Sequence, residues 1–131
     1  MKKVYPALIA ATESGGYVVR VPDVSGCMTT GKNLEDAFDN IRDALAACLC
    51  TLEDVCEPVP EPSTPIAVAQ DGYTVILVDV DTIAYRKETD VRSVRKNVSM
   101  PAWMSYMADS QGINCSQLLQ DALLKKLEAY A

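Results

Sequence analysis

The chain has 131 residues, a formal net charge of −6, 49% apolar residues and no histidine. This length fits one domain or two small ones, and no apolar run approaches the roughly 18 residues that a membrane span requires. No signal peptide opens the chain and its five cysteines are an odd number, so we expect a cytoplasmic protein with reduced thiols.

The first third of the chain predicts a β-hairpin followed by a short third strand. Residues 4–12 are mostly apolar, and residues 17–21 have the composition of a second strand. Between them lies Glu13-Ser-Gly-Gly16, a turn sequence with two glycines. Pro22 ends the second strand, and residues 27–31 are a candidate third strand.

Residues 33–56 predict the longest helix. Asn33 is a good N-cap, and Glu35 and Asp36 follow in the first turn, where the helix dipole favours acidic side chains. One face carries apolar residues at helical spacing, namely Leu34, Ala37, Phe38, Ile41, Leu45, Cys48, Leu49, Leu52 and Cys56. The simplest arrangement that buries this face packs the helix on a three- or four-stranded sheet.

Four prolines in residues 57–65 prevent the helix from continuing, so we expect an extended, semi-rigid connector. Residues 73–80 are strongly β-prone and should return to the sheet, with residues 83–87 as a candidate extension of that strand. A polar linker of residues 88–93 follows. Residues 1–90 therefore predict an α+β domain in which an N-terminal antiparallel sheet carries one long helix.

The last third has the order strand, proline, helix, turn, helix. Pro101 suits the first position of a helix, because its φ is fixed and it has no N–H. Gly112 can close that helix in the left-handed conformation, and Asn114 with Gln117 can form a capping box for the next one. The apolar faces of the two helices comprise Trp103, Met104, Met107 and Ala108, and then Cys115, Leu118, Leu119, Ala122, Leu123 and Leu127.

Residues 94–100 form the predicted strand, in which Arg95, Asn97 and Ser99 point to one side. The 41 residues of 91–131 are too few for a core of their own, so two copies should pair these strands above four helices. Such a ribbon-helix-helix homodimer places a two-stranded ribbon in the DNA major groove, where Arg suits guanine and Asn suits adenine. In the alternative interpretation, the polar side chains are only the solvated face of an edge strand.

The start of the second helix is a candidate phosphate site, because the first N–H groups of a helix have no partner inside it. The predicted DNA-binding residues are therefore Arg95, Lys96, Asn97, Ser99, Asn114, Cys115 and Ser116.

Charge divides the chain in the same way. Residues 1–90 carry seven basic and fifteen acidic side chains, whereas residues 91–131 carry five basic and three acidic ones. An acidic body suits a basic partner, because complementary potentials steer association. Acidity also keeps proteins soluble, and that simpler interpretation stays open.

One run carries a resemblance to a known family: Gly15-Gly-Tyr-Val-Val-Arg-Val-Pro-Asp-Val-Ser-Gly-Cys27. It is followed by Thr30-Gly31, by Leu34-Glu35 with Ala37 and Ile41, and by an exit rich in proline and glutamate. Over residues 4–65 this pattern resembles the N-terminal domain of the HicB antitoxin family. Residues 94–127 independently resemble the ribbon-helix-helix tail that many HicB proteins carry.

The resemblance implies a reduced ribonuclease-H-like domain that binds and neutralises HicA, a small basic mRNA-cleaving toxin with a double-stranded-RNA-binding-like fold. It also implies that the tail, residues 91–131, dimerises and binds the operator of the pair's own operon. Lys96 departs from the family pattern, which places an apolar residue there, so the register of the strand stays open. Further pairing of dimers into tetramers stays open as well.

Two other functions remain alternatives. One is a free-standing ribbon-helix-helix transcriptional regulator whose N-terminal domain senses a ligand or oligomerises. The other is a degenerate nuclease, which would need converging carboxylates such as Asp23, Asp79 and Asp81 to hold two metal ions. The chain has no histidine to act as a base and no paired CxxC motif, so we predict no enzyme, no cofactor and no metal site.

Overall fold

The computed structural model describes residues 1–129, which divide into one unit of Met1–Thr89 and a second unit from Asp90 onward. In the described part of the chain, no helix combines the length and the apolar composition that crossing a membrane requires.

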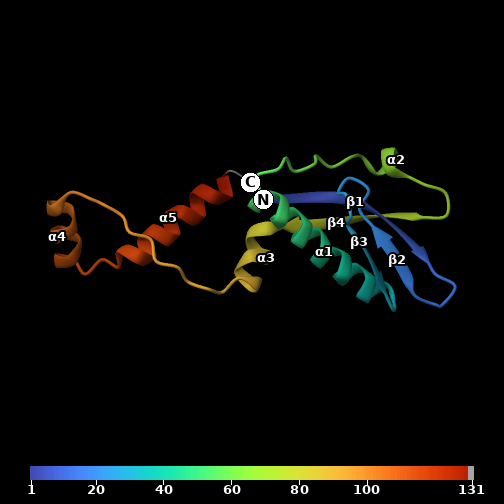
Figure 1. Cartoon of the computed structure of the whole chain (residues 1–131), viewed down its shortest axis with the longest axis horizontal. Helices are drawn as coiled ribbons and strands as arrows, with labels where there is room; N and C mark the ends of the chain where they lie inside the picture. Colours follow the sequence, from blue (N-terminus) through green and yellow to red (C-terminus); the bar gives the residue numbers. More distant parts are fainter. Residues whose placement is uncertain (130–131) are drawn as a thin grey trace. The chain divides into compact units, whose positions relative to one another are not determined.

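The first unit contains a four-stranded antiparallel sheet in the order β3-β2-β1-β4 (Figure 1). Strands β1 (Lys2–Ala11) and β2 (Tyr17–Arg20) form the predicted hairpin, and β3 (Met28–Gly31) extends it. Strand β4 (Thr74–Asp81) returns to pair with β1 over eight residues. The predicted α+β class, with an antiparallel sheet and one long helix, is confirmed.

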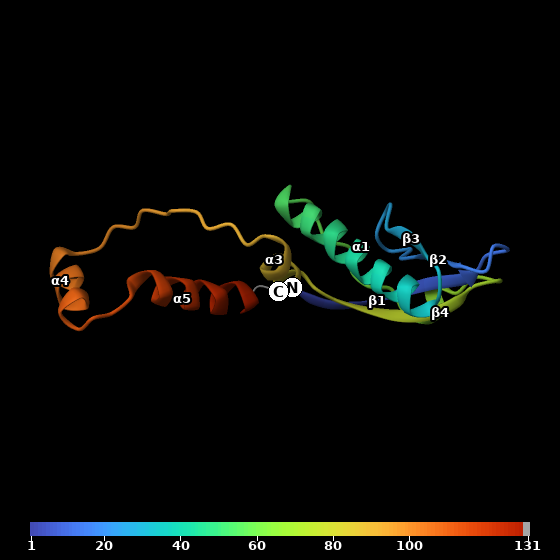
Figure 2. The same cartoon turned by 90° about the horizontal axis from the view of Figure 1, so that it is seen from below.

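Helix α1 (Leu34–Asp54) packs on one face of this sheet (Figure 2). The Asn33 side chain accepts a hydrogen bond from the Asp36 N–H at 2.8 Å, so the predicted N-cap is confirmed. The predicted apolar face is correct at its centre, where its residues are buried against the sheet, and wrong at its ends. Leu34 is 57% exposed, and Cys56 lies beyond the helix with a φ of 56°.

The proline-rich connector runs beside the first half of β1 (Figure 1). Lys3 forms an ion pair with Glu61 at 2.8 Å, and Asp23 accepts hydrogen bonds from both the N–H and the hydroxyl of Ser63. The connector ends in a short helix, α2 (Pro65–Val68), that the sequence analysis did not predict. The Thr64 hydroxyl caps it, and Pro65 takes its first turn, where no N–H is needed.

The predicted extension of β4 through residues 83–87 is wrong, because these residues belong to helix α3 (Thr82–Thr89). One Asp81 carboxylate oxygen accepts hydrogen bonds from the N–H groups of Ile83 and Ala84, at 3.1 Å each. The chain therefore leaves the sheet at Asp81 with a side chain that caps a new helix. Arg86 then ties α3 to the end of α1, since it pairs with Asp54 at 2.9 Å.

The second unit contains α4 (Ala102–Ser110) and α5 (Cys115–Ala129). Pro101 is the N-cap of α4, whereas the sequence analysis placed it at the first helical position, one residue further along. Gly112 has the predicted left-handed φ of 67°, and the Ile113 N–H bonds to the Ala108 carbonyl at 3.0 Å, which closes α4 as a Schellman motif.

Residues 90–101, which precede α4, contain no helix and no strand. The predicted strand over residues 94–100 is therefore not formed in this single chain. A lone strand has no partner for its backbone N–H and C=O groups, and the predicted pairing needs a second copy.

Tyr5 provides a test of how the connector is held. Its side chain is fully buried, and its hydroxyl donates to the Pro60 carbonyl at 2.5 Å. Because this hydrogen bond would be lost, we expect Tyr5→Phe to lower the free energy of unfolding by about 1 kcal/mol at neutral pH. Urea unfolding followed by circular dichroism would measure the loss.

The same residue should make stability sensitive to alkali. Burial, with Glu61 and Asp23 nearby, raises the pKa of Tyr5 from 10.0 to about 12. The stabilisation is complete below pH 10 and is lost as the pH rises to about 12, because only the unfolded chain releases its proton in that window. Tyr5→Phe should flatten this decline. An unchanged decline in the variant would assign it to other groups, such as Cys27.

Candidate functional site

The predicted DNA-binding residues before α4 all lie in the segment without regular structure. Arg95, Lys96, Asn97 and Ser99 are exposed. The apolar Val94 and Val98 are exposed as well, which leaves both predicted sides of the strand in solvent. These residues are therefore accessible in the structure. The register in which the predicted strands would pair is not determined, so the side of the strand on which Lys96 lies stays open.

The predicted phosphate site lies at the start of α5. The Asn114 side chain accepts a hydrogen bond from the Gln117 N–H at 3.0 Å, as an N-cap should. The reciprocal half of the predicted capping box is missing, because the Gln117 amide donates to Asp121 instead. Cys115 and Ser116 are exposed, and their backbone N–H groups have no hydrogen-bond partner within residues 1–129.

Within residues 1–129, most of the apolar faces of α4 and α5 remains exposed. Trp103 is 62% exposed and Leu118 is 59% exposed, and neither helix contains a buried residue. An apolar surface of this kind is buried in most folded proteins, so the second unit requires another surface to cover it. This observation agrees with the predicted dimer but does not itself show one.

The first unit has two neighbouring cavities between α1 and β4 that sequence reasoning did not identify. They share no lining residue, and we call them together the α1–β4 groove, with these lining residues: Leu34, Phe38, Arg42 and Asp43 of α1, Thr74, Ile76, Asp79, Val80 and Asp81 of β4, and Ala84, Tyr85 and Glu88 of α3. Helix α3 contributes three of the lining residues. Because the sequence analysis assigned residues 83–87 to a strand, it could not predict this groove.

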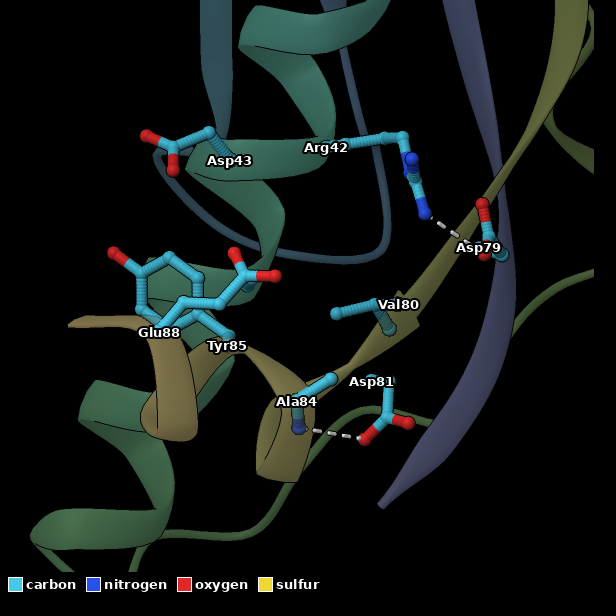
Figure 3. A pocket seen from close by; sticks show the side chains of 9 residues that line it. Arg42, Asp43, Asp79, Val80, Asp81, Ala84, Tyr85 and Glu88 are labelled. Carbon is cyan, nitrogen blue, oxygen red and sulfur yellow. Dashed lines mark hydrogen bonds and ion pairs between the residues drawn. The ribbon is translucent and has the colours of Figure 1, made fainter. Parts of the chain in front are cut away.

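One end of the α1–β4 groove is acidic (Figure 3). A cavity of about 240 Å³ there is lined by the carboxylates of Asp43, Asp79, Asp81 and Glu88. Arg42 is the one cation in this lining, and it is already paired with Asp79 at 3.1 Å while its guanidinium lies 5.9 Å from the centre of the Phe38 ring. Asp43 and Glu88 form no ion pair within residues 1–129.

The other end of the α1–β4 groove is apolar. A cavity of about 600 Å³ separates the first turns of α1 from the sheet. Its walls include Leu34 and Phe38 of α1 and Tyr17 of β2, with Thr74 and Ile76 of β4 on the side of the edge strand.

The carboxylates weighed above for a nuclease have other partners. Asp23 holds Ser63, Asp79 pairs with Arg42, and Asp81 caps α3. Within the described residues, no three carboxylate or thiol side chains lie in an arrangement that could hold a metal ion, including the four carboxylates around the acidic cavity. Cys27 is buried, and burial beside Cys48 raises the pKa of its thiol to about 12, which disfavours the reactive thiolate.

Comparison with known proteins identifies the relatives of this chain. The model of the HicB-like antitoxins of bacterial toxin–antitoxin systems matches residues 5–126. The chain belongs to the HicB-like antitoxin family. An uncharacterized 14.9 kDa protein of Haemophilus phage HP1 is 31% identical over 110 residues, which cover 80% of this chain and 78% of that protein.

Solved structures of HicB antitoxins have the same fold. The antitoxin HicB of Burkholderia pseudomallei is 28% identical with a TM-score of 0.55, covering 95% of this chain and 98% of that one. A chain of the HicA3 and HicB3 toxin–antitoxin complex is 27% identical with a TM-score of 0.52, covering 60% of this chain and 99% of that one. A toxin–antitoxin complex from Streptococcus pneumoniae shares the fold over 96% of this chain and 99% of that one, at 23% identity and a TM-score of 0.58.

Membership of the HicB-like family confirms the resemblance in the sequence and supports an antitoxin role. The match extends through most of the second unit, so the family pattern includes α4 and most of α5.

Proposed function

We propose that this protein is a cytoplasmic antitoxin that binds and neutralises a small HicA-like, mRNA-cleaving toxin, and that it represses its own operon. The first unit binds the toxin. The second unit dimerises and holds operator DNA. The family match over residues 5–126 is the observation that carries the proposal, because it spans both units.

The physical properties of the two units support this division. Residues 1–90 contain seven basic and fifteen acidic side chains, which suits a basic toxin and repels nucleic acid. The second unit exposes Arg95, Lys96, Asn97 and Ser99 together with apolar helix faces that need a partner. In the proposed dimer, the strands pair, Arg95 and Asn97 read base edges, and the N–H groups of Cys115 and Ser116 bind a phosphate. The chain acts by binding and catalyses no reaction.

The proposal is tested by expressing the full chain with the protein from the neighbouring reading frame. We expect a small basic protein to co-elute with the antitoxin in size-exclusion chromatography and to lose its RNA-cleaving activity. A version ending at residue 90 should still neutralise the toxin and should lose all binding to operator DNA. Operator binding without any toxin partner would favour the free-standing regulator instead.

Arg95→Ala tests the proposed base contact. If Arg95 bonds a guanine, its loss should weaken operator binding by about 1–3 kcal/mol and relax the preference at one base pair. Fluorescence anisotropy at fixed salt, with operator and with scrambled DNA, measures both effects. Lys125→Ala removes the same charge near the end of α5 and serves as the control. Equal losses for both variants on both DNAs would assign Arg95 to general electrostatic attraction.

A further inference from the structure

We propose that the α1–β4 groove is the surface that receives the toxin, and that an extended, basic segment of the toxin adds a strand to the edge of β4. This inference rests on the proposed function, because the partner is the proposed toxin.

The first observation is the free edge of β4. This strand pairs with β1 on one side only, and its other side forms no backbone hydrogen bond within residues 1–129. An edge of eight residues presents a row of unpaired N–H and C=O groups to which another extended segment can bond. Next to this edge, Leu77 is 58% exposed and Val4 is 50% exposed on the face away from α1.

The two ends of the groove indicate what the added strand carries. The apolar cavity is walled by Ile76 and the acidic cavity by Val80, four residues further along the same strand. Successive side chains of a strand point to opposite faces of the sheet. Two residues that are four positions apart therefore point to the same face, about 13 Å from each other. The toxin segment should therefore place an apolar side chain beside Ile76 and a lysine or arginine beside Val80.

Charge selects this occupant over a second copy of the antitoxin. Residues 1–90 carry an excess of eight acidic side chains, so pairing two β4 edges would bring two strongly negative surfaces together. At the acidic end, Asp43 and Glu88 are exposed and form no ion pair within residues 1–129, while Arg42 is held by Asp79. A cation from a partner satisfies these two carboxylates, and a second acidic body does not.

Amide hydrogen exchange tests the strand addition. The full chain is measured alone and in complex with the toxin from the neighbouring reading frame, by NMR at each residue of β4. We expect the β4 amides that do not bond to β1 to exchange at least about tenfold more slowly in the complex. The β3 amides, on the opposite edge of the sheet, should keep their rates. A stable complex in which β4 exchange is unchanged would overturn the proposal while leaving the antitoxin function intact.

Charge reversal tests the acidic end. The double variant Asp43→Lys/Glu88→Lys should raise the dissociation constant for the toxin by at least about tenfold. Glu13→Lys/Glu57→Lys makes the same change in net charge at exposed positions outside the groove and should have a much smaller effect. Equal losses in the two double variants would show that only overall charge matters and would overturn the site.

The remaining outcomes are also decisive. Leu34→Lys, at an exposed position beside the apolar cavity, should weaken toxin binding without lowering the stability of the free chain. Protection of β4 amides that depends on the concentration of the antitoxin alone would identify a second copy as the occupant and overturn the proposal. Absence of any complex between the wild-type chain and the toxin would refute the proposed function itself.

Discussion

Replacing Gly31 with alanine should destabilise the first unit by about 3 kcal/mol, a large fraction of a small domain's stability. Gly31 is the last residue of β3, and a Cβ added there would collide with the backbone nitrogen and Cα of Ala37 in the first turn of α1. The helix and the strand cannot keep this spacing once a methyl group lies between them. Urea unfolding followed by circular dichroism measures the effect.

Gly15→Ala provides the matched control. Gly15 has a φ of 91° but no atom within 4 Å of the added Cβ, so its variant reports backbone strain alone. We expect that strain to cost about 1 kcal/mol. Ala37→Gly should not rescue Gly31→Ala, because the backbone atoms of residue 37 remain in place. Similar losses for the two alanine variants would mean that α1 moves away from β3 at little cost.

Replacing Leu123 with lysine should dissociate the proposed dimer, which is held together by the second unit. Leu123 lies on the apolar face of α5 and is 46% exposed in the single chain, so a lysine there should cost the monomer little. In the proposed dimer it would bury a charge, and we expect the dissociation constant of the dimer to rise by about 100-fold or more. Analytical ultracentrifugation measures this change, and operator binding should be lost with it.

Gln117→Lys is the control for this variant, since it adds the same charge to an exposed position on the opposite face of the same helix. It should leave the dimer intact. Circular dichroism of both variants checks that α5 is retained. A Leu123→Lys protein that remains dimeric and still binds operator would remove the apolar face of α5 from the interface.

Local signals in the sequence were sufficient to predict most of the first unit. Asn33 indicated the start of α1, the glycine pair of residues 15–16 indicated the hairpin turn, and apolar, β-prone runs indicated the strands. These features depend on neighbours close in sequence. The same applies to Gly112 and Asn114 in the second unit, whose predicted roles at the ends of α4 and α5 are confirmed.

The errors occurred where one residue type fits two structures. Thr82 and Ile83 are β-branched and follow a strand, yet Asp81 caps a helix there, and its position just before α3 was the available signal. Thr64-Pro65 was a similar signal for α2. Because α3 was missed, the groove that it helps to form with α1 and β4 was missed too.

The predicted strand over residues 94–100 could not be established in any single chain. Its hydrogen bonds and the burial of Val94 and Val98 depend on a partner molecule, so neither sequence nor one copy of the structure determines its register. The predicted DNA contacts of Arg95, Asn97 and Ser99 depend on that register and stay predictions.

The connector beside β1 has a consequence for aggregation. Residues 2–7 of β1 have no strand partner on the side away from β4 within residues 1–129, and the connector occupies that side through Pro60 and Glu61. Prolines 58, 60 and 62 have no N–H, so this segment cannot itself template a further strand. We therefore expect the connector to hinder this stretch of β1 from pairing with a strand of another molecule, whereas nothing of this kind covers the edge of β4 within residues 1–129.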